Sequence, residues 1–531
     1  MALEAAYHYL QLAIAQGTSA QAILLVVFVL LITRLAWLRT STAITAPSKQ
    51  QLPPSPPGKL PIIGHLHLIG SHPHVSFREL DAKYGRDGLM LVHVGAVPTI
   101  VVSTPQAAEV VLRTQDHVLS SRPRSPVADI IRYGSTDVAF APYGEYWRLA
   151  RKLVTTHLLS PKMVFSKRCD REEEVRLVVA KIKEAAASAP GKPLDISELL
   201  GAYTSDFVCR AVLGESHRKG GRNKIFRELT EISASLLGGF NLEDYFPSLA
   251  NMDVFLRLIC AKAKGVSKRW DKLFNELLSE YARSSEVSGL KEGSSEDFVH
   301  LLLSLQKEYG LSTDNIKAIL VNMFEAAIET SFLVLEYSMA ELMNNRHILA
   351  NLQKEVRMDA SDGKRLDMIM EDDLSRMPYL KATIKESMRV HPPAPFLLPH
   401  FSTSDCKING YSIPSGTRVI VNAWALARDP KAWERADEFL PDRFLEEGRD
   451  ADVDMNGKDP RFVPFGAGRR ICAGANFAIA TVEIMLANLI YHFDWELPSE
   501  LEAIGAKVDM SDQFGMTLRR KEKLYLVPRI F

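Results

Sequence analysis

The clearest candidate for chemistry is Cys472, in the glycine-rich segment FGAGRRICAG between Phe465 and Gly474. A thiolate that binds a metal needs a shielded sulfur, backbone N–H groups directed at it and a positive helix end nearby. Glycines let such a loop approach a flat ring, and an apolar helical run begins just behind it at Phe477. Arg470 is placed to meet an anionic group on that ring. Cys472 is thus a candidate metal ligand, the alternative being a buried structural cysteine.

A second chemical pair, Glu329 and Thr330, lies within the helical segment AAIETS at 326–331. A threonine inside a helix can hydrogen-bond to the carbonyl four residues earlier, here Ala326, and this loosens the helix. A carboxyl and a hydroxyl group side by side in a loosened helix are candidates to deliver protons as general acids. The alternative is that Thr330 only fills the helix.

A third pair, Glu386 and Arg389, stands in the motif ESMR. Residues three apart share one face of a helix and can form an ion pair. Such pairs are common on solvated surfaces. In this sequence we interpret the pair as structural, locking the fold, and not as catalytic.

A largely helical body must position these residues. Residues 311–362 contain neither glycine nor proline, and Ser312 or Thr313 can cap a helix that begins there. We expect a very long helix, broken near 344–345. Short β-rich stretches occur at 89–102 and 411–422. The sequence therefore predicts a mainly α fold with small β-sheets.

The N-terminus reads as a membrane anchor. Residues 20–32 are almost wholly apolar, and 35–38 extend the run past Arg34, which can snorkel, toward the roughly 18–20 residues that span a bilayer. Basic residues follow the run and only Glu4 is charged before it, so the positive-inside rule places the rest of the chain in the cytosol. The basic-first pattern of a cleaved signal peptide is missing. We expect an uncleaved, single-pass anchor.

The segment LPPSPPG at 52–58 reads as a stiff spacer, because such density of proline prevents a helix. The expected organisation is a lumenal N-terminus at 1–19, a transmembrane anchor at 20–40, a proline-rich hinge at 41–59 and one cytosolic domain at 60–531.

Composition excludes some classes of protein. Lys plus Arg and Asp plus Glu both count 64 in the 531 residues, so the chain lacks the overall positive charge of nucleic-acid-binding proteins. The five cysteines include no CxxC pair, which indicates a reducing compartment and no disulfide framework.

The loop FGAGRRICAG contains F-x-x-G-x-R-x-C-x-G, and with the other motifs it resembles the cytochrome P450 family over essentially the whole chain. The resemblance implies haem b with the Cys472 thiolate as axial ligand, and O–O bond cleavage aided by that sulfur. It implies dioxygen as substrate, NADPH through NADPH–cytochrome P450 reductase, and the endoplasmic reticulum membrane. Candidate docking residues for the reductase are Arg148, Lys152, Lys458 and Arg461. The alternative interpretation, equally good, is that these residues form an ordinary solvated charged face.

The resemblance also implies roles for other residues. It places Phe465 against the haem, and Arg443 as the partner that closes the Glu386–Arg389 pair. Four residues are implied to meet the haem propionates: Arg470, Trp147, Arg151 and His400. The family usually has glycine where this chain has Ala327, so a shallower helix kink is expected, and the geometry of the oxygen-binding groove stays open.

Substrate contacts are implied at 127–133, 236–240, 321–325, 396–398 and 514–517. The residues expected to line the pocket are Phe240, Phe324, Phe396, Leu397, Phe514 and Met516. Such walls suit a compact aromatic heterocycle of low polarity, with ordinary core packing as the alternative for any one phenylalanine.

Within the family, PPSPPGKLPIIGHLHLIG, DHVLSSRPR and LVNMFEAAIETSFLVLEYSMAELMNNRH look like a grass defence group that makes benzoxazinoid hydroxamic acids. Ala327 and Ala473 look most like the last member of that series, which N-hydroxylates 2-hydroxy-1,4-benzoxazin-3-one. The alternative is an earlier step, acting on indolin-2-one or 3-hydroxyindolin-2-one. A reductase-independent isomerase or dehydratase, or a non-catalytic haem protein, is disfavoured because Glu329 and Thr330 are both present.

Overall fold

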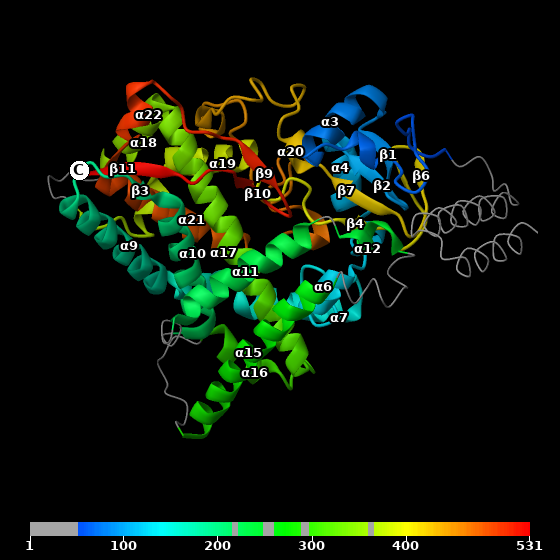
Figure 1. Cartoon of the computed structure of the whole chain (residues 1–531), viewed down its shortest axis with the longest axis horizontal. Coiled ribbons are helices and arrows are strands. Elements are labelled where there is room, and N and C mark those ends of the chain that lie inside the picture. Colours follow the sequence, from blue (N-terminus) through cyan, green and yellow to red (C-terminus); the bar gives the residue numbers. More distant parts are fainter. Residues whose placement is uncertain (1–50, 215–220, 240, 248–259, 288–296, 359–365) are drawn as a thin grey trace, which may run out of the picture. The chain divides into compact units, whose positions relative to one another are not determined.

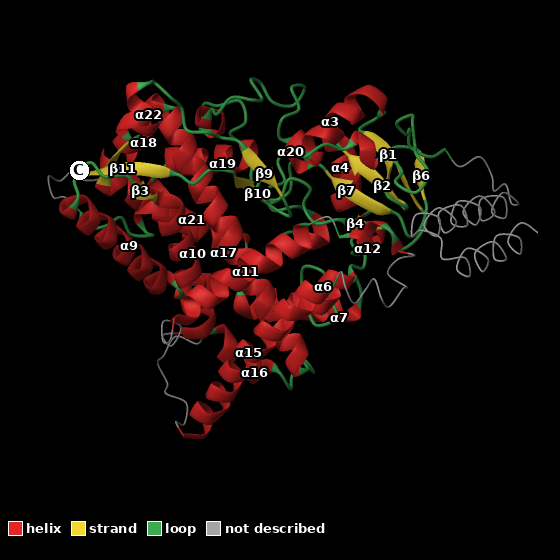
Figure 2. Cartoon of the chain, in the orientation of Figure 1, coloured by secondary structure: helices red, strands yellow, loops and turns green. Residues whose placement is uncertain are grey.

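The computed structural model describes residues 51–214, 221–239, 241–247, 260–287, 297–358 and 366–531. The expected anchor at 20–40 and the predicted pocket residue Phe240 lie outside these ranges. Residues Leu52–Phe531 form one compact unit, mostly helical with small sheets (Figure 2). The predicted fold class is confirmed for this unit.

The long helix α17, Thr313–Asn344, runs through the middle of the unit (Figure 1). Its first turn is held by Ser312, whose hydroxyl accepts a bond from the Asn315 amide while the Asn315 side chain accepts from the Ser312 amide. It ends at the predicted position, and α18, Arg346–Met358, follows. Among the described residues α17 is the one helix long and apolar enough to cross a membrane, and most of it is buried inside the protein.

Several helices bury apolar side chains together with those of α17. The helices that share its core are α9 (Arg168–Ser188), α10 (Ile196–Leu213), α11 (Arg222–Gly238), α19 (Pro378–Val390) and α21 (Ala475–His492). In Figure 1, α10 and α21 lie beside α17. This bundle gives the central helix a rigid setting.

The main sheet has the strand order β1-β2-β7-β4 and lies with α3 and α20 on one side of the unit (Figure 1). Its strands are β1 (Leu89–Val94), β2 (Val97–Val102), β7 (Arg418–Val421) and β4 (His400–Phe401). β1 and β2 form an antiparallel hairpin, and β2 pairs in parallel with β7, so Val101 faces Ile420. Both predicted β-rich stretches are confirmed.

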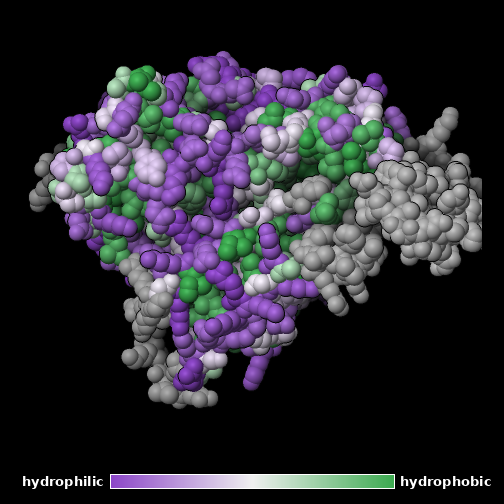
Figure 3. Space-filling view, in the orientation of Figure 1, coloured by the Kyte–Doolittle hydropathy of each residue, from purple (hydrophilic) through white to green (hydrophobic). Residues whose placement is uncertain are grey.

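Smaller elements complete the unit. The short strands are β3 (Leu194–Asp195), β5 (Cys406–Ile408), β6 (Tyr411–Ile413), β8 (Phe493–Glu496), β9 (Asp512–Phe514), β10 (Leu518–Arg520) and β11 (Tyr525–Ile530). The remaining α-helices are α3 (Pro73–Tyr84), α4 (Pro105–Glu109), α5 (Asp116–Leu119), α6 (Pro126–Ile131), α7 (Glu145–Leu153), α8 (Pro161–Ser166), α12 (Leu242–Tyr245), α15 (Ala261–Val287), α16 (Phe298–Leu305), α20 (Ala423–Leu426) and α22 (Ser499–Ala503). Polar side chains cover most of the face drawn in Figure 3.

The Glu386–Arg389 pair is fully buried on α19. Two bonds of 2.8 Å join the guanidinium to the carboxylate, and Arg443 adds a third at 3.2 Å. Arg389 also donates to the carbonyls of Ala427 and Ala436. Each charged side chain of this cluster has hydrogen-bond partners, and these partners lie on α19 and on the chain that follows it. The cluster therefore fastens α19 to that segment, which suits a structural role.

Candidate active site

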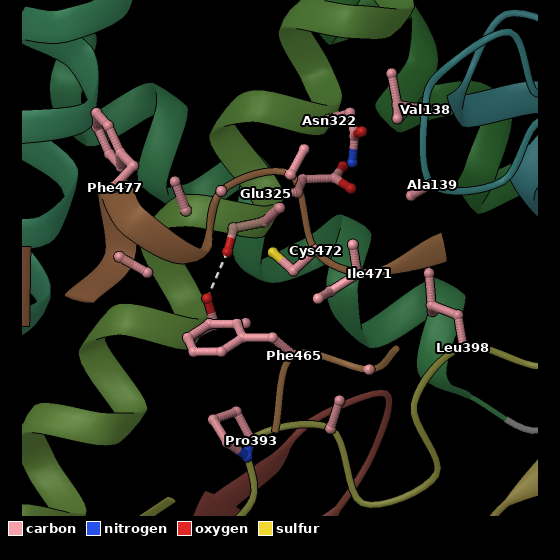
Figure 4. A pocket seen from close by; sticks show the side chains of 18 of the residues that line it. Val138, Ala139, Asn322, Glu325, Pro393, Leu398, Phe465, Ile471, Cys472 and Phe477 are labelled. Carbon is pink, nitrogen blue, oxygen red and sulfur yellow. Dashed lines mark hydrogen bonds between the residues drawn. The ribbon is translucent and has the colours of Figure 1, made fainter. Parts of the chain in front are cut away.

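A cavity lies between α17 and the loop that carries Cys472 (Figure 4). Most of its lining is apolar, with a few charged groups from distant parts of the chain. The predicted site residues that line it are Arg151, Glu329, Thr330, Leu397, His400, Phe465, Arg470, Cys472 and Met516. The structure thus brings the cysteine loop and the acid–hydroxyl pair to one space.

The cysteine loop is shaped by backbone contacts. The Cys472 amide donates to the Phe465 carbonyl at 2.8 Å. Gly468 has φ +64°, and a Cβ there would stand 1.8 Å from the Leu112 carbonyl oxygen, so only glycine fits. Burial raises the pKa of the Cys472 thiol, and the Gly474 amide and Arg151 oppose this rise. A backbone amide and a cation directed at the sulfur are what a thiolate ligand needs.

Three guanidinium groups line the cavity near this loop: Arg122, Arg151 and Arg470. Arg470 donates to the carbonyls of Ser120 and Ala141, each at 2.6 Å. Burial, with the charge of Arg122 next, lowers the pKa of Arg470 to about 8. Buried cations that repel one another favour an anionic ligand. The two carboxylates of haem fit this donor set, and the thiol of Cys472 fits its iron.

His400 is buried at the same end of the cavity. Its Nδ1 lies 2.8 Å from the Leu119 carbonyl, to which it donates. Burial, and then the charge of Arg122, lowers the pKa of His400 to about 3. The neutral ring has only an acceptor left at Nε2. A hydrogen bond with a haem propionate therefore requires either a protonated propionate that donates to Nε2, or a propionate charge that raises this pKa so that the ring donates.

Trp147 is not among the residues that line the described cavity, and its contact with a propionate stays a prediction. Its indole N–H donates to the Val138 carbonyl at 3.0 Å. The guanidinium of Arg470 lies over its ring, 4.2 Å from the centroid. Trp147 therefore positions Arg470, while Arg151, one turn later on α7, faces the cavity and donates to the Ile471 carbonyl.

On α17 the Thr330 hydroxyl donates to the Ala326 carbonyl at 2.6 Å, as the sequence predicted for a threonine inside a helix. Glu329 is held differently. Its carboxylate accepts bonds from the Thr517 hydroxyl and, at 2.7 Å, from Arg519 Nε. Thr330 and Glu329 thus both line the cavity, and the Glu329 carboxylate is in addition tied to strand β10 through Arg519.

Three predicted pocket residues do not line the cavity described here. Phe324 points to the other side of α17 and stacks on Phe226 with ring centroids 4.0 Å apart. Phe396 and Phe514 pack against each other, 5.5 Å apart, in a separate cluster. The cavity wall at these segments is instead formed by their neighbours Leu397 and Met516.

Sequence reasoning missed three charged residues of the cavity: Arg122, Arg132 and Glu325. Arg122 lies in DHVLSSRPR, which carried the family resemblance, but was not singled out. Arg132 and Glu325 fall within predicted pocket ranges, yet the walls there were expected to be mostly apolar. The structure pairs them directly inside the cavity. The sequence feature that could have indicated Arg132 and Glu325 is a charged residue within a mostly apolar predicted pocket range.

The four candidate docking residues differ in their surroundings. Arg461 is paired with Asp459 and Asp450, and Lys458 lies 3.7 Å from Asp454. Arg148 and Lys152 are exposed on α7. Of the four, Arg148 and Lys152 are the two that form no ion pair with a described residue.

Comparisons with known proteins show the family to which the chain belongs. A family model described as "Cytochrome P450" matches residues 53–524. A 3-hydroxyindolin-2-one monooxygenase from Zea mays is 77% identical, covering 100% of this chain and 99% of that protein. An indolin-2-one monooxygenase from Zea mays is 61% identical and covers 100% of both. A solved zebra fish cytochrome P450 with abiraterone has a TM-score of 0.70 at 24% identity, covering 87% of this chain and 100% of that one.

Proposed function

Because this chain belongs to the cytochrome P450 family, we propose that it oxidises 3-hydroxyindolin-2-one in benzoxazinoid biosynthesis. The observation that carries the proposal is 77% identity, over the whole chain, with a maize enzyme named for that substrate. The chain is a monooxygenase that uses haem, dioxygen and electrons from NADPH delivered by a partner reductase.

Bound haem would supply activation of dioxygen, favoured by a thiolate ligand. In our proposal Cys472 is that ligand. Arg122, Arg151 and Arg470 would hold the propionates, because their guanidinium groups line the cavity near the cysteine loop. Phe465, whose carbonyl accepts from the Cys472 amide, lines the same cavity and would pack beside the bound haem.

Proton delivery is assigned to α17. The Thr330 hydroxyl lies in the cavity and is oriented by the Ala326 carbonyl. Glu329 lines the same cavity and is linked to Arg519, which is partly exposed. We assign Thr330 as the group that holds a proton near the reacting oxygen, and Glu329 as the carboxyl group that passes protons to it. Arg519 keeps its own proton and holds the Glu329 carboxylate in place.

The relatives' names favour this earlier step over N-hydroxylation of 2-hydroxy-1,4-benzoxazin-3-one, which the sequence had favoured through Ala327 and Ala473. Adding one oxygen atom to 3-hydroxyindolin-2-one with ring expansion gives 2-hydroxy-1,4-benzoxazin-3-one. The two candidate reactions are therefore consecutive, and the product of one is the substrate of the other. A direct assay separates them.

The assay is aerobic turnover of membranes that contain the full chain, a plant NADPH reductase and NADPH. The substrates are 3-hydroxyindolin-2-one, indolin-2-one and 2-hydroxy-1,4-benzoxazin-3-one, tested separately. We expect a ring-expanded product from the first. A hydroxamic acid from the third, detected by its colour with iron, and no turnover of the first would overturn the proposal. Cys472→Ser is the control and should lose both activity and the ferrous-carbonyl Soret band of a thiolate haem.

For location, we propose that residues 20–40 anchor the chain in the endoplasmic reticulum membrane by a single pass, with the catalytic domain in the cytosol. The apolar run and the basic residues after it support this. Deleting residues up to Ser48 should release much of the protein from membranes while haem binding is kept. Full membrane retention of the truncated protein would contradict the anchor.

A further inference from the structure

A buried ion pair faces the cavity on the α17 side. Arg132, the residue that follows α6, donates from Nη2 to Oε2 of Glu325 on α17. Their side chains are 2% and 1% exposed, and both line the cavity that holds Cys472 and Thr330. The nearest other carboxylate, Asp137, is 3.9 Å from Arg132 Nη1, too far for a hydrogen bond.

The pair leaves hydrogen-bonding groups unused. Arg132 Nε and Nη1 have no hydrogen-bond partner among the described residues. The Ser233 hydroxyl bonds to the Glu325 carboxylate, which keeps further acceptor capacity at its two oxygens. Asn322, one turn earlier on the same face of α17, also lines the cavity, and Figure 4 shows its amide beside Glu325. A buried donor or acceptor without a partner costs stability. A donor and an acceptor left open side by side therefore indicate a ligand with the complementary pair.

We propose that Arg132 and Glu325 together bind the amide edge of a small aromatic lactam. A ring holds its amide cis, so N–H and C=O point from the same edge of the molecule. Glu325 Oε1 accepts from the lactam N–H, and Arg132 donates to the lactam carbonyl. This deepens the proposed function and rests on it, since 3-hydroxyindolin-2-one is such a lactam.

The arrangement determines specificity as well as affinity. A lactone with the same ring has an oxygen in place of the N–H and cannot donate to Glu325. The carboxylate then faces a second acceptor, and a site built around a hydrogen bond rejects an analogue that lacks it. Apolar walls alone would bind lactam and lactone about equally.

The test compares 3-hydroxyindolin-2-one with its lactone counterpart, 3-hydroxybenzofuran-2-one, by spectral titration of the haem-loaded full chain. Wild type should bind the lactam roughly tenfold to a hundredfold more tightly. Glu325→Gln keeps an acceptor oxygen but loses the charge, so it should weaken lactam binding and reduce the preference while lactone binding stays nearly unchanged. Arg132→Gln should weaken the binding of both ligands, because both carry the carbonyl.

Glu336→Gln is the matched control. Glu336 is also a buried carboxylate on α17, held by Ser197, but it does not line the described cavity. This variant should keep the wild-type preference for lactam. The ferrous-carbonyl spectrum checks that each variant is folded, and the comparison of the two ligands on wild type needs no variant at all.

Equal affinity of wild type for lactam and lactone, or a full preference in folded Glu325→Gln, would overturn the inference. Turnover is measured separately. If wild type prefers the lactam yet oxidises none of the three candidate substrates, the proposed function fails and the binding role of the pair stands. If wild type oxidises 3-hydroxyindolin-2-one but binds lactam and lactone equally well, the proposed function stands and the binding role of the pair fails.

Discussion

Arg519 donates a hydrogen bond from Nε to Oε1 of Glu329 at 2.7 Å, which fastens strand β10 to the middle of α17. The two ends of this contact differ in environment, because the Arg519 side chain is 37% exposed and that of Glu329 only 5%. The Thr517 hydroxyl donates to the same carboxylate. A polar connection therefore reaches from solvent to the cavity beside Thr330.

This connection makes Glu329→Gln informative. Glutamine keeps the size of the side chain but cannot carry a proton as a carboxylate does. If Glu329 supplies protons, product formation should fall on the order of 100-fold, with haem content unchanged. Glu336→Gln, a buried carboxylate elsewhere on α17, should leave the rate near that of wild type. Equal rates for wild type and Glu329→Gln would remove Glu329 from proton delivery.

Thr330→Ala should separate NADPH consumption from product formation. Loss of the hydroxyl removes both the bond to the Ala326 carbonyl and the group that holds a proton in the cavity. Reducing equivalents should then leave as hydrogen peroxide, measured beside NADPH oxidation and product. Thr330→Ser keeps the hydroxyl and should remain largely coupled. Intact coupling in the alanine variant would contradict the role given to Thr330.

Local patterns predicted the scaffold of this site well. The absence of glycine and proline at 311–362, with Ser312 as a cap, predicted α17 and its end near residue 344. The spacing of Glu386 and Arg389 predicted their pairing on one helix face. These features depend on residues close in sequence, where helix geometry alone fixes the neighbours.

The lining of the cavity could be predicted only in part, because a range of residues does not say which side chains face inward. Phe324 and Glu325 are adjacent on α17, yet Phe324 joins an aromatic cluster and Glu325 lines the cavity. The partner of Glu325 is Arg132, 193 residues away. Such contacts depend on tertiary packing, which no local spacing encodes.

The Glu386–Arg389 cluster should be essential to stability. Both side chains are fully buried, so Glu386→Gln leaves a buried guanidinium without its counter-charge, a loss of about 3–5 kcal/mol. We expect poor haem incorporation and unfolding at a much lower denaturant concentration, followed by the Soret band. Arg435→Gln, which removes an exposed ion pair with Glu438 nearby, is the control and should change little. Similar behaviour of the two variants would argue against a structural role for Glu386.

The affinity for lactams should depend on pH through Glu325. Burial raises the pKa of Glu325 to about 7, and the charge of Arg132 opposes this rise. The charged groups that act on it are Arg132, Asp137 and Glu329. The ionised carboxylate accepts the lactam N–H more strongly than the protonated acid does, so binding should weaken as pH falls through the pKa, by up to roughly tenfold between about pH 8 and pH 6.

Spectral titrations of 3-hydroxyindolin-2-one across that range measure this dependence. In Glu325→Gln the affinity should be low and nearly independent of pH, because glutamine does not titrate. The lactone has no N–H to donate, so its binding to wild type should not weaken at low pH. A lactam affinity that stays constant in wild type, or that changes equally in wild type and Glu325→Gln, would show that another group titrates. Parallel loss of lactam affinity and lactam preference as pH falls would identify the Glu325 carboxylate as the acceptor.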